Sequence, residues 1–236
     1  MTTFRSICLA LLLLCQTASA QVQERVIGVP TRAGVTQRFL VAAPDNAKAA
    51  VVLFAGGHGG LQISPKGTLT WGNNNFLVRN RQRFASHELL AAVVNAPSDR
   101  QSTPYLGGFR QRSEHVADIK AVIAWLKQQA KIPVWLVGTS RGTRSAGFIA
   151  TQLTKDDGGP DGLVLTATIL TDDKGRPVPD MNLEKITIPV LVAHHKQDGC
   201  RHCLYSDIPR LMNKLTRVAR NRAAHFGRRH ESRRPL

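Results

Sequence analysis

The sequence has no internal repeat, no low-complexity tract and no linker, so nothing divides it into separate domains. Its longest apolar stretch, residues 7–14, is too short for a membrane span, which needs about 20 apolar residues. Aromatic residues make up only 6% of the chain and are not interleaved with basic ones, which argues against a surface that stacks nucleic-acid bases.

The first 20 residues have the pattern of a cleaved signal peptide. Arg5 precedes the apolar stretch, and Ala18-Ser19-Ala20 supplies the small-x-small cleavage site. We therefore expect the mature chain to begin at Gln21 and to be periplasmic or secreted. A lipoprotein anchored through Cys15 is the alternative, but Leu14 stands where such a site needs a small residue.

Acidic residues are few, and the resulting positive charge is concentrated at one end. The net charge is +16, of which residues 210–236 contribute +8, with nine Lys or Arg and one Glu. A basic tail over residues 216–236 is able to hold anionic polymers or membrane surfaces. Because half of the net charge belongs to residues 210–236 and not to a face of the domain, we expect no specific nucleic-acid partner.

Apolar runs alternate with helical patterns over residues 21–215, which we assign to one domain. The expected strands are Glu24–Val29, Thr36–Ala43, Ala50–Ala55, Leu89–Val94, Val134–Val137, Leu163–Ile169 and Val190–His194. The expected helices include Ser113–Ala130, Arg144–Leu153 and one from about Leu204 to Val218. This alternation predicts an α/β fold in which a mostly parallel sheet carries helices on both faces.

The pentad Gly138-Thr139-Ser140-Arg141-Gly142 lies between an expected strand and an expected helix. A strand that turns sharply through G-x-S-x-G into a helix is the nucleophile elbow of serine hydrolases, in which a strained backbone presents the serine hydroxyl. A serine that merely caps the helix is the alternative.

Two further polar features follow the ends of expected strands. Residues 56–60 form the glycine-rich segment Gly-Gly-His-Gly-Gly, and Asp198 follows the last apolar strand. The carboxyl ends of parallel strands meet at one edge of a sheet, so both features are expected near Ser140. A phosphate-binding loop is disfavoured because no Gly-Lys-Ser/Thr follows the glycines.

These motifs, in this order, resemble the α/β-hydrolase superfamily over residues 51–198, and within it small exported bacterial hydrolases of the dienelactone-hydrolase or esterase kind. The resemblance implies a serine hydrolase that cleaves an ester or related acyl bond of a small molecule through an acyl-enzyme, without a metal or cofactor. It implies Ser140 as nucleophile and Asp198 as the triad acid, with Asp172 and Asp173 as fallbacks. The oxyanion donors would be the backbone amide of Arg141 and that of Gly57 or His58.

The general base is harder to assign. In the family, the base follows one further strand beyond the acid. In this chain, the sequence after Leu215 is Arg-rich and lacks apolar periodicity. We therefore expect the last strand and helix to be missing, as a frameshift or premature end in the coding sequence would cause. His225 is the preferred base and His230 the second choice. An inactive hydrolase-like protein without the triad histidine is the alternative function.

Once the expected signal peptide is removed, two cysteines remain in the chain: Cys200 and Cys203. In an oxidising compartment they are able to pair with each other, and two idle thiols are the alternative. A thioredoxin-like site is disfavoured because too little chain follows. Zinc bound with His194, His195 or His202 is disfavoured by the irregular spacing.

Overall fold

The computed structural model describes residues 22–172, 175–218 and 221–226. The expected signal peptide, Asp173 and His230 lie outside these residues. The strands are β1 (Gln23–Arg32), β2 (Val35–Ala43), β3 (Ala49–Phe54), β4 (Leu89–Val94), β5 (Val134–Ser140), β6 (Gly162–Thr168), β7 (Val190–His195) and β8 (Asn221–Phe226). The α-helices are α1 (Phe76–Arg79), α2 (Arg81–Ser86), α3 (Ser113–Ala130), α4 (Gly142–Gln152) and α5 (Ile208–Met212). Short 3-10 turns cover Ser98–Arg100, Val178–Asp180, Leu183–Lys185 and Tyr205–Asp207.

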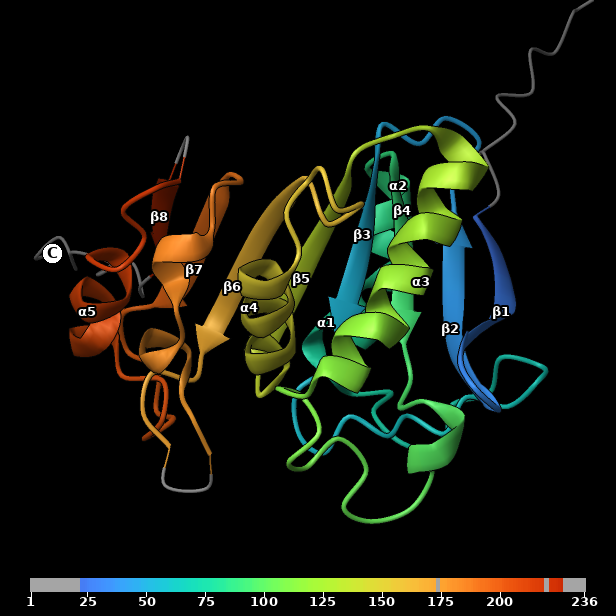
Figure 1. Cartoon of the computed structure of the whole chain (residues 1–236), viewed down its shortest axis with the longest axis horizontal. Coiled ribbons are helices and arrows are strands. Elements are labelled where there is room, and N and C mark those ends of the chain that lie inside the picture. Colours follow the sequence, from blue (N-terminus) through green and yellow to red (C-terminus); the bar gives the residue numbers. More distant parts are fainter. Residues whose placement is uncertain (1–21, 173–174, 219–220, 227–236) are drawn as a thin grey trace, which may run out of the picture.

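All eight strands form one sheet in the order β1-β2-β4-β3-β5-β6-β7-β8 (Figure 1). The β1–β2 and β2–β4 pairs are antiparallel, and every other pair is parallel. The expected mostly parallel sheet is therefore confirmed. Crossover helices between parallel strands bring the loops after β3, β5, β6 and β7 to the same edge of the sheet.

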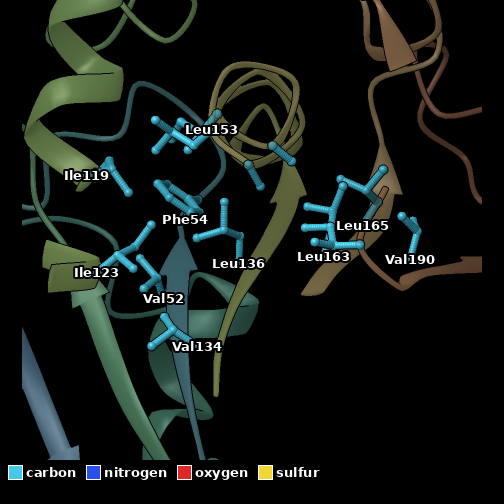
Figure 2. Packing of buried hydrophobic residues seen from close by; sticks show 14 of the residues in the cluster. Val52, Phe54, Ile119, Ile123, Val134, Leu136, Leu153, Leu163, Leu165 and Val190 are labelled. Atoms are coloured by element: carbon cyan, nitrogen blue, oxygen red, sulfur yellow. The ribbon is translucent and has the colours of Figure 1, made fainter. Parts of the chain in front are cut away.

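Helices cover both faces of the sheet, because alternate strand residues point to opposite sides. On one face, Val52 and Leu136 belong to a core cluster that includes residues of α3, α4 and α5. Figure 2 shows Phe54 and Leu136 of this cluster on neighbouring strands. On the other face, Val51 and Val137 pack in a second cluster with α1 and α2.

The C-terminal region corrects two expectations. A strand is present where none was expected: β8 pairs in parallel with β7 over six register positions, from Val190↔Asn221 to His195↔Phe226. An edge strand is held by backbone hydrogen bonds to one neighbour and needs no buried apolar stripe, so Arg222 and Phe226 remain exposed and no periodicity marks it. No helix follows β8 within the described residues.

The expected helix from Leu204 to Val218 is also much shorter in the structure. It contains a 3-10 turn, then α5, which ends at Met212. The chain turns after Asn213, and Leu215 is buried at 2% exposure from this turn and not from a helix.

The bend between β5 and α4 is packed against the end of β3. A Cβ placed on Gly142 would lie 2.0 Å from the carbonyl oxygen of Phe54, and one on Gly138 would lie 2.7 Å from the Cα of Thr143. Both obstructing groups are backbone atoms, which are unable to rotate away. Only glycine therefore allows α4 to start this close to β3.

This packing predicts a large effect of Gly142→Ala. The added methyl group must separate α4 from β3, so we expect the free energy of unfolding to fall by about 3 kcal/mol or more. Gly199→Ala is the matched control, because a Cβ at Gly199 meets nothing within 4 Å. Urea unfolding of both variants checks the prediction, and equal losses would contradict it.

Candidate active site

Ser140 ends β5 and stands directly before Arg141, the N-cap of α4. Its φ is +51°, in the left-handed region that non-glycine residues rarely adopt. The bend is held by Thr143, whose Oγ1 donates a hydrogen bond of 2.6 Å to the carbonyl oxygen of Ser140. The Ser140 residue is partly exposed, and its Oγ makes no hydrogen bond to another described residue. The sharp strand-to-helix bend expected from the pentad, which we call the elbow, is therefore present, and the role of Ser140 as nucleophile stays a prediction.

The glycine-rich loop lies against the elbow. A Cβ on Gly56 would be 3.1 Å from the Cβ of Ser140, so the loop approaches the serine at van der Waals distance. The next residue, Gly57, is exposed and has a φ of +62°. Within the described chain, the amides of Gly57, His58 and Arg141 have no acceptor. These are the amides that the sequence proposes as oxyanion donors, and they border one cavity with His58 and Arg141 in its lining.

His58 is fixed in this loop by two aromatic rings. Its imidazole lies 3.9 Å from the ring of Trp71 and is stacked at 4.4 Å on the ring of Tyr105, measured between centroids. Its Nδ1 accepts a hydrogen bond of 3.1 Å from the Gly60 amide. Partial burial, together with the charge of Arg110, lowers the pKa of His58 below its usual value. The imidazole is therefore neutral at physiological pH.

Arg110 ties the glycine-rich loop to α4, a role that the sequence analysis missed. The residue is buried, with 6% of its surface exposed. It donates to the carbonyl oxygens of Ala55 at 3.1 Å and Gly57 at 3.2 Å, and to Ser145 Oγ at 2.9 Å. Burial, followed by repulsion from Arg144 and Arg141, lowers the pKa of Arg110 to about 9, so it stays cationic at neutral pH. No motif marked this residue, and only the fold brings it under the loop.

His115 completes this buried network. It is fully buried on α3, where its Nε2 lies 3.0 Å from Ser145 Oγ and its ring packs against those of Phe54 and Phe109. Its Nδ1 has no hydrogen-bond partner in the described part of the molecule. Burial, and then the charge of Arg110, lowers its pKa to about 3. The ring is thus held neutral beneath the elbow.

The two carboxylates considered for the triad have different surroundings. Asp198 follows β7 and is partly exposed, and it accepts a hydrogen bond of 3.0 Å from the Cys200 amide. The carboxylate of Asp172 is buried and forms an ion pair of 2.8 Å with Arg144. Asp198 is therefore the better placed to accept a hydrogen bond from a histidine base. Its role as triad acid stays a prediction.

The preferred base, His225, is not brought to Ser140. It lies on β8, three strand positions from β5, a separation of about 14 Å at ordinary strand spacing. Its ring is exposed and makes an edge contact of 5.0 Å with the ring of Tyr205. No described histidine forms a hydrogen bond with Ser140. His194, the register partner of His225, is buried and accepts a hydrogen bond of 2.7 Å from the Thr168 amide.

Two cavities flank the elbow. One, of about 590 Å³, lies on the side of the glycine-rich loop and is lined by four arginines, namely Arg110, Arg112, Arg141 and Arg144. The other, of about 840 Å³, is an apolar groove along the sheet face between α1 and β8, where Trp135, Leu191 and Phe226 are among the lining residues. The charged cavity, and not the larger groove, contains Gly57, His58 and Arg141 of the expected site.

The remaining chemical groups of the described residues do not assemble into a metal centre. The described residues contain no cluster of three or more His, Cys, Asp or Glu side chains able to hold a metal ion. Cys200 and Cys203 are free thiols with their sulfur atoms 2.8 Å apart, and burial raises the pKa of Cys203. None of the described helices has the length and apolar character that a membrane span requires.

The low pKa of His115 predicts acid-sensitive folding. An unfolded histidine binds a proton below pH 6.5, whereas buried His115 does so only near pH 3, so stability falls as the pH drops through this interval. Between pH 7 and pH 5, we expect protonation linked to His115 to lower the free energy of unfolding by about 2 kcal/mol. Urea unfolding at both pH values should show that His115→Gln removes this loss, whereas His87→Gln, at an exposed position, keeps it. An unchanged pH dependence in His115→Gln would contradict the assignment.

Comparison with known proteins shows the fold. No family model matches the chain, and no curated protein matches it. A solved cold-adapted esterase from an Arctic intertidal metagenomic library aligns with a TM-score of 0.62 at 15% identity, over 88% of this chain and 85% of that one. A putative dienelactone hydrolase from Klebsiella pneumoniae subsp. pneumoniae MGH 78578 aligns with a TM-score of 0.64 at 14% identity, over 86% and 85%.

A third similar structure is an esterase from Pyrococcus furiosus, with a TM-score of 0.62 at 11% identity over 88% of this chain and 84% of that chain. At such identities the likeness concerns backbone architecture and not chemistry. The strand order, the strained serine after β5 and these alignments agree: the chain has the α/β-hydrolase fold.

Proposed function

We propose that this protein is a serine hydrolase that cleaves small esters with Ser140 as nucleophile. The observation that carries the proposal is the φ of +51° at Ser140, at the end of β5 and directly before α4. Strain of this kind is maintained where it presents a reactive group, and here it leaves a hydroxyl without a partner in the described chain. The esterases and dienelactone hydrolase with similar folds support the same class of reaction.

In the proposed reaction, Ser140 Oγ forms a bond to the ester carbonyl carbon and its proton passes to a general base. The amides of Arg141 and of Gly57 or His58 stabilise the resulting oxyanion. Collapse of the tetrahedral intermediate breaks the ester C–O bond, and the alcohol leaves with the proton. Water then attacks the acyl-enzyme and releases the carboxylic acid. Asp198 is the proposed acid that orients the base. His225, three strand positions away, does not reach Ser140 in this arrangement, and His230, the second choice, lies outside the described residues.

The second candidate function is an inactive hydrolase-like protein. It is favoured by one observation: no histidine of the described residues is hydrogen-bonded to Ser140, and His225 lies on a distant strand. Without a base, the hydroxyl is a poor nucleophile even though Ser140 is partly exposed and strained. The two candidates share the fold and differ only in the reactivity of Ser140.

A fluorophosphonate probe separates them, because it reacts with serines that are activated for attack. We expect the probe to label Ser140 and the protein to hydrolyse 4-nitrophenyl acetate. Ser140→Ala should abolish labelling and reduce turnover by about 10³-fold or more, since the nucleophile is lost. Ser113→Ala, at an exposed serine on α3, is the control that keeps both. Folded wild-type protein that is neither labelled nor active would establish the inactive alternative.

A further inference from the structure

The cavity beside the glycine-rich loop carries more positive charge than the described residues around it neutralise. The described residues that line it include four arginines and no Asp or Glu. Arg144 is paired with the buried Asp172. Arg110 is bonded only to Ser145 and to two backbone carbonyls in the described chain, so its buried charge meets no carboxylate. Arg141 is exposed, and no acidic side chain pairs with it within the described residues.

The guanidinium groups lie close enough to affect one another. Repulsion from Arg144 and Arg141 contributes to the depressed pKa of Arg110. Such a cluster is costly unless an anion is bound, because like charges repel and a buried cation has lost most of its hydration. The N-terminus of the eleven-residue helix α4 faces the same region and adds a positive dipole end.

We propose that this cavity binds a carboxylate carried by the substrate, so that the protein prefers esters with a second, anionic end. Arg141 and Arg112, both exposed, make the direct ion pairs, while Arg110 supplies buried positive charge behind them. The proposal rests on the proposed function, because it assigns the substrate class of that site. Guanidinium is suited to a carboxylate, which it binds through two parallel hydrogen bonds.

The position of the cavity relative to the nucleophile supports a substrate group over a remote effector. Arg141 follows Ser140 directly, and Gly57 and His58 line the same cavity. A volume of about 590 Å³ is in the range of small-molecule sites. The carboxylate would belong either to the acyl part or to the alcohol part of the ester. Both have the same chemistry in the cavity, and paired substrates distinguish them.

Kinetics with charged and neutral ester pairs test the preference. For the acyl part, mono-4-nitrophenyl adipate is compared with methyl 4-nitrophenyl adipate. For the alcohol part, 4-acetoxybenzoate is compared with its methyl ester. In at least one pair, we expect kcat/KM to be about tenfold higher for the anion, as one well-placed ion pair would give. Equal values in both pairs would overturn the proposal.

Charge-removing variants show whether the cavity is responsible. Arg141→Gln and Arg112→Gln should each lower the anion-to-neutral ratio of kcat/KM by about fivefold. Arg83→Gln removes the same charge from an exposed position on α2, outside the cavity, and should leave the ratio unchanged. A preference that persists in both cavity variants, or that falls equally in Arg83→Gln, would contradict the assignment.

Binding to Ser140→Ala separates this proposal from the proposed function, since it needs no turnover. Calorimetric titration with monomethyl adipate should give a Kd about tenfold lower than with dimethyl adipate, and Arg141→Gln in the same background should remove the difference. Selective binding without turnover in the wild type would support the carboxylate site and reject the esterase. Turnover with no preference for the anion, in kinetics or in binding, would support the esterase and reject the carboxylate site.

Discussion

The close contact between the start of α4 and the end of β3 is the constraint on which the site depends. Gly142 lies against the Phe54 carbonyl, and Gly56 in the following loop lies against Ser140. The strained serine and the glycine-rich loop are therefore positioned by one packed junction and not by two independent elements. Backbone atoms of the central strands form this junction, which gives the hydroxyl and the neighbouring amides a fixed geometry before any substrate binds.

Beneath this junction, the protein buries the cationic side chain of Arg110, although an apolar residue would have a lower free energy cost of burial. Arg110 donates hydrogen bonds to the carbonyl oxygens of Ala55 and Gly57, which hold the glycine-rich loop in place. A neutral hydrogen-bond donor would serve that structural purpose without the desolvation cost of a guanidinium, which is several kcal/mol. The neutral rings of His115 and His58 nearby add no further charge. Among the described side chains that line the cavity, the positive charge therefore comes from the arginines, and the N-terminus of α4 adds its dipole.

The central strands, α3 and the bend at Ser140 could be predicted from the sequence because local pattern and tertiary packing agree there. Val134–Val137 and Val190–His194 are continuous apolar runs, fully buried on one face of the sheet, and glycines mark the bend after the first of them. The strand β8 could not be predicted, because an edge strand with exposed Arg222 and Phe226 has no periodic signal. The buried network of Arg110, Ser145 and His115 was equally invisible. Its members come from a loop and two helices and share no motif, so only the fold brings them together.

Arg141 links the two chemical features of this edge of the sheet. Its backbone amide stands at the N-terminus of α4, beside the hydroxyl of Ser140, whereas its side chain extends into the arginine-lined cavity. A ligand carboxylate held by that side chain would bring the ester carbonyl within reach of the same residue's amide. Binding energy from the anionic end would then orient the reacting end, and this use of remote contacts raises the rate of the chemical step and not only the affinity. A neutral ester of equal size fills the same volume but leaves the guanidinium groups unpaired, so it would be less strictly oriented. The charge that makes the cavity costly to build is, on this reasoning, what makes it selective.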